Sequence, residues 1–134
     1  MMKRICHDNE GVAAVEMALA LPILLSFIYG IFQMGAILAA DAGMQHALGE
    51  GARFATLCVN PTQAGCNSPT KTQVQTRMQD KIFGVQVGTF DVGLPVVDAG
   101  HMDLQIDYRV SPNFLFFSLP QFTVTRTKRV YLSL

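Results

Sequence analysis

The chain has 134 residues and a formal net charge of zero. This length allows one small domain and a membrane anchor, and the balanced charge argues against a general attraction to nucleic acid. Charged residues make up 15% of the chain, against about a quarter in a typical soluble domain. The shortage is local, because no charged residue occurs between Met17 and Ala40.

The uncharged stretch 17–40 is long enough to cross a membrane. As a helix it would measure about 36 Å at the usual rise per residue, and about 20 residues suffice to span the hydrocarbon core of a bilayer. A cleaved secretory signal has a shorter apolar region, of about 7–15 residues, so we favour an uncleaved span. We expect a leader over 1–11, a helix over 12–54 that contains the span, and a domain over 55–134.

The charges on either side of this stretch predict the direction of the span. Lys3 and Arg4 precede it, whereas Asp41 and Glu50 follow it. Basic residues prefer the cytoplasmic flank of a membrane helix, while acidic residues contribute little to this preference. We therefore expect the N-terminus in the cytoplasm and the domain on the other side, in the periplasm or another extracytoplasmic space.

Small residues recur at every fourth position along the outer part of the long helix. A stripe of this kind forms a shallow groove and lets another helix approach closely. Glycine costs a helix about 1 kcal/mol per residue, and tight packing would offset that cost. Two partners remain open, namely neighbouring subunits and the chain's own C-terminal sheet. The stripe consists of Gly35, Ala39, Gly43, Ala47, Gly51 and Ala55.

Two of the three cysteines follow the helix and lie close together in sequence. Cys58 and Cys66 bracket the turn-rich segment VNPTQAG on the predicted outer side, whereas Cys6 lies in the leader. An external pair can persist as a disulfide, because the compartment is oxidising. A metal site is the alternative, but no histidine or further cysteine lies nearby to complete four ligands. We expect the Cys58–Cys66 disulfide in a loop.

A second, short helix is predicted in TKTQVQTRMQDKIFG, over residues 70–84. Val74, Met78 and Ile82 recur every four residues, which is the spacing of one helix face, and Gly84 is a stop signal. Thr70 or Thr72 is expected to cap its N-terminus.

The remainder of the chain is predicted to form a small antiparallel sheet of about three strands. In DLQIDYRV, apolar and polar residues alternate from 103 to 110, which indicates a strand with one face in water. The β-branched segment FTVTRTKRVYLSL favours a second strand, and a third is expected within GVQVGTFDVGL. We interpret the basic cluster Arg126, Lys128 and Arg129 as an exposed sheet edge, where charge discourages further pairing. The predicted fold class is therefore α+β.

An aromatic cluster lies between two prolines in SPNFLFFSLP, over residues 111–120. It contains Phe114, Leu115, Phe116 and Phe117. One interpretation is a connection folded over a small core, since apolar clusters under long loops are common. The other is an exposed contact patch for a partner or a membrane surface.

The opening of the helix, GVAAVEMALALP, places Gly11 five residues before Glu16. Together with the later ALGEGARFATL, it closely resembles the TadE-like family of tight-adherence (type IVb) pilus systems. That family shows G-x-A-A-V-E-F-A-L-x-L-P and R-E-G-A-R-x-A elements at these places. Met17 replaces the usual aromatic residue, and Gly49 replaces the arginine before EGAR. The resemblance extends over about residues 10–58 and implies a pilin-like fold.

The resemblance also implies processing and assembly roles. A prepilin peptidase would cut after Gly11, leaving Val12 as the new N-terminus and Glu16 as its fifth residue. In a filament the new α-amine would pair with Glu16 of the same or an adjacent helix; alternatively, Glu16 marks the membrane boundary at the headgroup level. Pro22 is compatible with local unwinding during assembly, or with a simple kink that membrane helices tolerate.

No catalytic constellation is recognisable in the sequence. It lacks G-x-S-x-G, H-E-x-x-H and P-loop motifs, and Asp98, His101 and Asp103 in DAGHMD are better explained by a turn than by a metal site. We expect no cofactor, no metal and no enzymatic activity.

Three functions remain open. The first is a minor pilin or pseudopilin in the bacterial inner membrane, for which incorporation into a surface pilus is an open question. Its implied partners are the prepilin peptidase, other pilin-like subunits, the inner-membrane assembly platform and membrane lipid. The second is an uncleaved membrane-anchored assembly factor, and the third is a membrane-tethered binding or enzymatic domain.

Overall fold

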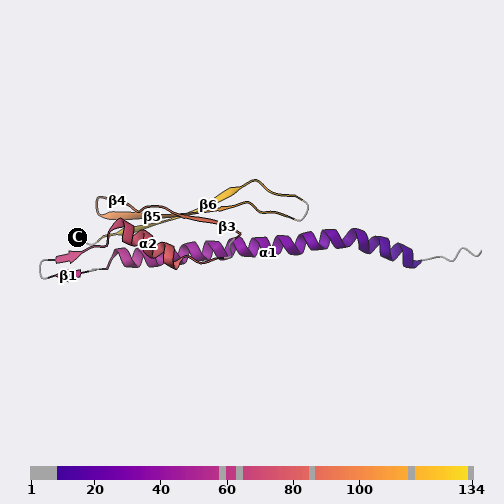
Figure 1. The fold of residues 1–134 in the computed structure, drawn as a ribbon, viewed down its shortest axis with the longest axis horizontal. Helices are drawn as coiled ribbons and strands as arrows, with labels where there is room; N and C mark the ends of the chain where they lie inside the picture. The colour runs from indigo at the N-terminus through magenta and orange to yellow at the C-terminus, as the bar shows by residue number, and fades with distance from the viewer. Residues whose placement is uncertain (1–8, 58–59, 63–64, 85–86, 115–116, 133–134) are drawn as a thin grey trace, which may run out of the picture.

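The fold is α+β, with one very long helix, a short second helix and a small antiparallel sheet. The computed structural model describes residues 9–57, 60–62, 65–84, 87–114 and 117–132. The first helix, α1 (Asn9–Ala55), is longer than the predicted 12–54 at both ends. Its C-terminal half lies against the rest of the chain, whereas its N-terminal half projects well beyond the domain (Figure 1).

Two short strands follow α1, in a region where the sequence predicts only a loop. Strands β1 (Asn60–Thr62) and β2 (Gly65–Asn67) pair with each other in antiparallel register. Strands of three residues are too short for a period-two pattern to stand out in the sequence, which explains why this ribbon was not predicted. Cys58 and the side chain of Cys66 lie outside the described residues, so their disulfide stays a prediction.

The second helix, α2 (Lys71–Lys81), forms where the periodicity predicts it. Thr70 is its N-cap, because its hydroxyl accepts a hydrogen bond from the Gln73 N–H while the Gln73 side chain accepts one from the Thr70 N–H. This reciprocal capping box pairs two N–H groups that would otherwise lack partners. Val74 and Met78 are fully buried, so the predicted apolar face is the one that packs.

The sheet has four strands, one more than the sequence indicates. They are β3 (Gly88–Val92), β4 (Val96–Asp98), β5 (His101–Val110) and β6 (Phe122–Tyr131). The central strand β5 pairs with β6 along one edge and with both β3 and β4 along the other, always antiparallel. The additional strand, β4, has only three residues and follows Pro95. Gly100, with φ +80, forms the tight turn that joins it to β5.

The core lies between one face of the sheet and the two helices. β5 alternates buried and more exposed residues along its length, as predicted, and its buried face packs against the outer half of α1. The helices thus form one layer and the sheet the other (Figure 1). The core residues that share this interface are Ala40, Met44, Ala47, Leu48, Val74, Met78, Leu104, Ile106, Tyr108 and Val110.

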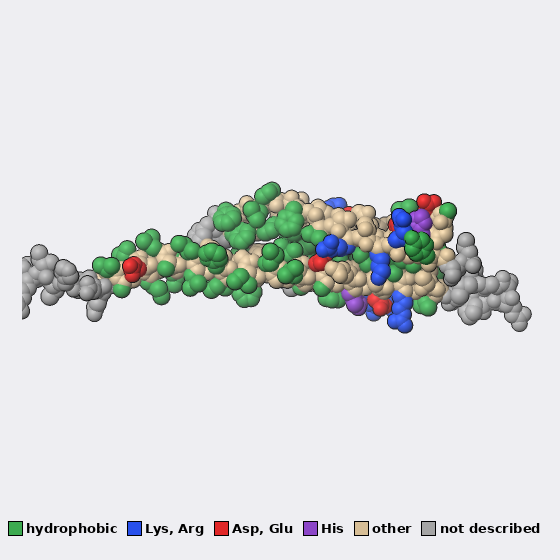
Figure 2. Space-filling model, turned by 180° about the vertical axis from the view of Figure 1, so that it is seen from behind, with side chains coloured by type: hydrophobic (Ala, Val, Ile, Leu, Met, Phe, Trp, Pro, Cys, Tyr) green, Lys and Arg blue, Asp and Glu red, His purple; other side chains and the backbone are tan. Residues whose placement is uncertain are grey.

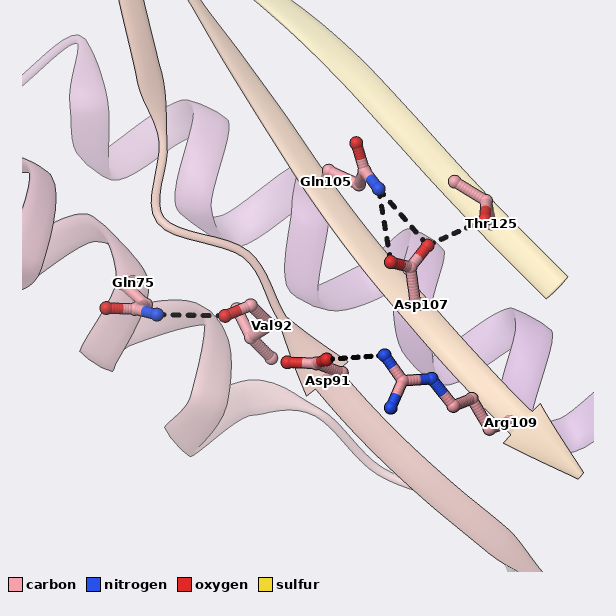
Figure 3. A network of polar contacts seen from close by, with 7 residues as sticks. All are labelled: Gln75, Asp91, Val92, Gln105, Asp107, Arg109 and Thr125. Carbon is pink, nitrogen blue, oxygen red and sulfur yellow. Dashed lines mark hydrogen bonds and ion pairs between the residues drawn. The ribbon is translucent and has the colours of Figure 1, made fainter. Parts of the chain in front are cut away.

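The opposite face of the sheet is polar and carries a side-chain network (Figure 3). Asp91 and Asp107 are directly opposed in the β3–β5 register, an arrangement of like charges that is unfavourable by itself. Arg109 offsets it by donating to Asp91 at 3.0 Å, and the Thr125 hydroxyl donates to Asp107 at 2.6 Å. This face therefore stays compatible with water.

Candidate functional site

The first turns of α1 present the predicted processing site and its associated carboxylate. Gly11, Val12 and Glu16 all lie on the projecting part of the helix and are exposed. A β-carbon added to Gly11 would meet nothing within 4 Å. The structure thus leaves Glu16 exposed for a partner, and the described side chains of residues 11–15 and 17–40 around it carry no charge.

Pro22 lies inside α1 without ending it. Because proline has no N–H, it cannot donate to the carbonyl of Ala18, four residues earlier. One turn later, the Ser26 hydroxyl donates to the Pro22 carbonyl at 2.8 Å. Side-chain bonds of this kind are a usual way for membrane helices to adjust around a proline.

The stripe of small residues divides into two parts along the helix. Gly35 is exposed and Ala39 half-buried, whereas Gly43, Ala47, Gly51 and Ala55 are buried. A β-carbon on Gly43 would overlap the Phe83 backbone carbonyl, and one on Gly51 would lie 2.9 Å from the Met78 sulfur. The two buried glycines therefore lie against α2 and the residues that follow it. Leu104 of β5 also lies 3.5 Å from the β-carbon position at Gly51, so the sheet takes part in covering the stripe.

The basic cluster on β6 is more than an exposed edge. Arg126 faces the helix layer and forms a two-pronged ion pair with Asp41 of α1, at 2.6 and 3.2 Å. Asp41 is the first charged residue after the uncharged stretch, so this pair fixes the sheet to the helix where the charges begin. Sequence reasoning missed this contact because the two residues are 85 positions apart.

Arg129 belongs to the other face of β6. It donates to Asp103 of β5 at 2.8 and 2.9 Å. These hydrogen bonds and the nearby positive charge hold the pKa of the Asp103 carboxyl below its ordinary value. The pair joins two strands on the solvent face, which is a structural role.

The turn residues considered for metal binding have local partners. The Asp98 carboxylate accepts a hydrogen bond from the Ala99 N–H at 2.7 Å, and the His101 ring lies 3.8 Å from Asp103. Within the described ranges, no group of three or more metal-ligating side chains is present. The predicted turn before a strand is what the structure shows at this place.

The aromatic segment does not fold over the domain core. Asn113 and Ser118 pair across the hairpin that connects β5 to β6, and this connection extends along α1 toward the helix's projecting half (Figure 1). Phe114 packs against Gly30, and the Gln33 amide donates to the Asn113 carbonyl at 3.1 Å. Leu115 and Phe116 lie outside the described residues.

Gln33 is a residue that sequence reasoning missed. It is the only amide side chain in the uncharged stretch 17–40, and in the structure only 8% of its surface is exposed. An amide in such a setting is costly unless it is hydrogen-bonded. That isolation was the available signal, and its partner is a backbone carbonyl that no sequence pattern identifies.

Comparison with known proteins supports the resemblance drawn from the sequence. The family model described as TadE-like protein matches residues 11–53. No curated protein and no solved structure matches the chain. The matched segment coincides with α1, which is also long and apolar enough to cross a membrane. Over residues 11–53, which form nearly all of its long helix, the chain is similar to the TadE-like family.

Proposed function

We propose that the protein is a minor pilin or pseudopilin of a tight-adherence (type IVb) pilus system, inserted with its N-terminus in the cytoplasm. The observation that carries this proposal is the TadE-like match to α1, together with the shape of that helix. The outer half of the helix packs in the domain core, while its inner half is apolar and exposed. An apolar helix half that is mostly exposed in the described chain is suited to lipid before assembly and to neighbouring helices afterwards.

Glu16 has a defined role in this proposal. Near the centre of a bilayer a carboxylate costs about 2.5–3.5 kcal/mol on insertion scales, so a filament that buries it needs to supply a partner. Cleavage after Gly11 would create an α-amine at Val12, one helical turn away. That amine, on the same or an adjacent subunit, would neutralise the carboxylate inside the packed helices.

The mass of the intact protein, purified from membranes with an active prepilin peptidase, tests the processing step. We expect a mature chain that begins at Val12, because the peptidase would cut after Gly11. A full-length chain would contradict the pilin assignment and favour an uncleaved, membrane-anchored assembly factor. Measuring the mass before and after reduction also tests the disulfide, because reduction of a Cys58–Cys66 bond would increase the mass of the chain by two hydrogens.

Substitution of Glu16 tests the assembly step. We expect Glu16→Ala to be inserted in the membrane at normal levels but to be absent from sheared filaments, or to lower pilus number. Asp80→Asn is a matched control, because it also removes one exposed carboxylate but lies on α2, away from the projecting helix. Normal piliation in the Glu16→Ala strain would contradict the role given to this carboxylate.

A further inference from the structure

The hairpin between β5 and β6 contacts the projecting region of α1 at Gly30. We call residues 112–119 the aromatic hairpin. No charged residue occurs between Arg109 and Arg126, so the whole connection is uncharged, as the membrane stretch of α1 is. Two segments far apart in the sequence thus share the same composition and lie side by side (Figure 1).

The aromatic hairpin contacts the helix through Phe114 and Asn113. The Phe114 ring lies so close to Gly30 that a β-carbon there would be 3.1 Å from its Cε1 atom. Phe117 stacks on Phe114 with a centroid distance of 4.9 Å. The bond from Gln33 to the Asn113 carbonyl then fixes the base of the hairpin.

Helix geometry gives the depth of this contact. On α1, Asp41 is the first charged residue after the uncharged stretch, and Gly30 precedes it by eleven residues. On the sheet, the last charged residue before the hairpin is Arg109, which is paired with Asp91. At about 1.5 Å per residue, Gly30 lies about 16 Å further along the helix axis. Half the hydrocarbon core of a bilayer is about 15 Å thick, with a headgroup layer of several ångströms outside it. Phe114, which packs on Gly30, therefore lies deeper than the charged residues of both elements and is level with the acyl chains.

The backbone of the hairpin is suited to that environment. Polar backbone groups are tolerated in lipid only when they are hydrogen-bonded internally. The Phe114 N–H donates to the Phe117 carbonyl at 2.7 Å, and the Phe117 N–H returns the bond at 3.3 Å. The Leu119 N–H donates to the Pro112 carbonyl at 2.9 Å, and Pro112 and Pro120 have no N–H to satisfy.

The outer surface of the hairpin is apolar and continuous with that of the helix. Phe117 is 57% exposed, and Leu119 and Phe122 are exposed beside it. A shallow apolar groove joins the two elements, lined by Ile23, Phe27, Ile31, Met34, Phe114 and Phe117. Figure 2 shows hydrophobic side chains covering the projecting helix and the adjacent tip of the sheet, with most charged side chains gathered toward the other end.

We propose that the aromatic hairpin is a second membrane contact, which inserts beside α1 into the leaflet on the domain's side and binds lipid acyl chains. This inference rests on the membrane insertion of α1 in the proposed function. It goes beyond that function because it gives the domain itself a lipid-binding element. Two contacts, at the helix and at the hairpin, would fix the height and the rotation of the domain above the bilayer.

Tryptophan fluorescence tests the proposal directly, because the native chain contains no tryptophan. The full-length variant Phe117→Trp is reconstituted in phosphatidylcholine vesicles with and without lipids brominated on the acyl chains. Phe32→Trp, on the projecting helix, is the reference for lipid contact. Tyr131→Trp, at a position 75% exposed at the far end of β6, is the reference for water. Leu119→Trp provides a second probe of the hairpin.

We expect brominated lipid to quench Phe117→Trp and Leu119→Trp to an extent similar to Phe32→Trp, and to leave Tyr131→Trp unquenched. Quenching of Phe32→Trp alone would overturn the hairpin proposal while leaving the helix in the membrane. Emission of Phe117→Trp that is unquenched but shifts when protein is diluted into excess lipid would show that a second copy covers the hairpin, which also overturns it. Loss of quenching in Phe32→Trp as well would contradict membrane insertion itself.

Discussion

At the scale of single residues, the glycines of α1 have different roles although the sequence presents them alike. Gly43 is required where it lies, because the Phe83 backbone occupies the space that a side chain would need. Gly49 has open space around its β-carbon position. Gly51 faces the flexible Met78 side chain, which can move aside more easily than backbone can.

This difference predicts opposite effects for two alanine substitutions. Gly43→Ala should lower the free energy of unfolding by about 1–3 kcal/mol, as overpacking typically does. Gly49→Ala, the matched control, should raise it by about 0.5–1 kcal/mol, since alanine is the better helix former. Urea unfolding of the full chain in mild detergent, followed by circular dichroism, measures both. Equal destabilisation by the two substitutions would contradict the packing of α1 on the α2 segment.

At the scale of secondary-structure elements, ion pairs join strands and helices that hydrophobic contacts already bring together. Arg126 and Asp41 connect β6 to α1, and Arg129 and Asp103 connect β6 to β5. Both arginines are about half exposed, and exposed ion pairs add little to stability because water and salt screen them. Their contribution is to fix where β6 lies relative to its neighbours.

The Asp103–Arg129 pair predicts a pH dependence. The pKa of the Asp103 carboxyl is lowered from 3.8 in the folded state, chiefly by hydrogen bonds from Arg129. Because the folded-state pKa is lowered, the stabilisation is complete above the ordinary carboxyl pKa. It is lost as the pH falls from that value through the lowered, folded-state pKa. We therefore expect Asp103→Asn to lower the melting temperature at neutral pH, and the gap from wild type to narrow as the pH falls below the ordinary carboxyl pKa.

Thermal unfolding at neutral and at acidic pH measures this gap. Asp80→Asn serves as the control, since Asp80 forms no ion pair within the described residues. A gap that is the same at neutral and acidic pH would show that Asp103 acts through packing rather than through its charge.

At the scale of the whole molecule, the projecting half of α1 and the domain are suited to different environments, lipid for the first and water for the second. The core cluster begins at Ala40, and Gln33 and Ala36 are the first residues of α1 that are buried. Everything before them projects from the domain, with exposed apolar side chains along its length. The domain therefore owes little of its stability to the inner half of the helix.

Removal of that half should leave the domain folded. A chain that begins at Gln33 keeps the core cluster and the Gln33–Asn113 bond, and it loses peripheral apolar contacts such as that of Phe114 with Gly30. We expect its free energy of unfolding to stay within about 1 kcal/mol of the full chain's in the same detergent, as is usual for changes outside the core. An unfolded product, seen by circular dichroism and hydrogen exchange, would show that the projecting helix is part of the folding unit.

The elements with strong local signals could be predicted from the amino-acid sequence alone. The uncharged stretch 17–40 indicated the long apolar helix, the four-residue spacing of Val74 and Met78 indicated α2, and the alternation from Leu104 to Val110 indicated β5. The TadE-like resemblance rested on Gly11, Glu16 and the EGAR element, and the family match covers that helix. These signals are local because helix periodicity, strand alternation and a motif each depend on residues close in the chain.

Which elements meet emerged from the tertiary packing alone. That packing placed the α2 segment on Gly43 and Gly51 of α1, joined Arg126 to Asp41, and brought the aromatic hairpin to Gly30 and Gln33. Strand β4 and the β1–β2 ribbon also emerged only there, since three residues are too few to show a period. Contacts across 80 or more residues depend on how whole faces pack, and an individual residue's neighbours in sequence do not reveal that packing.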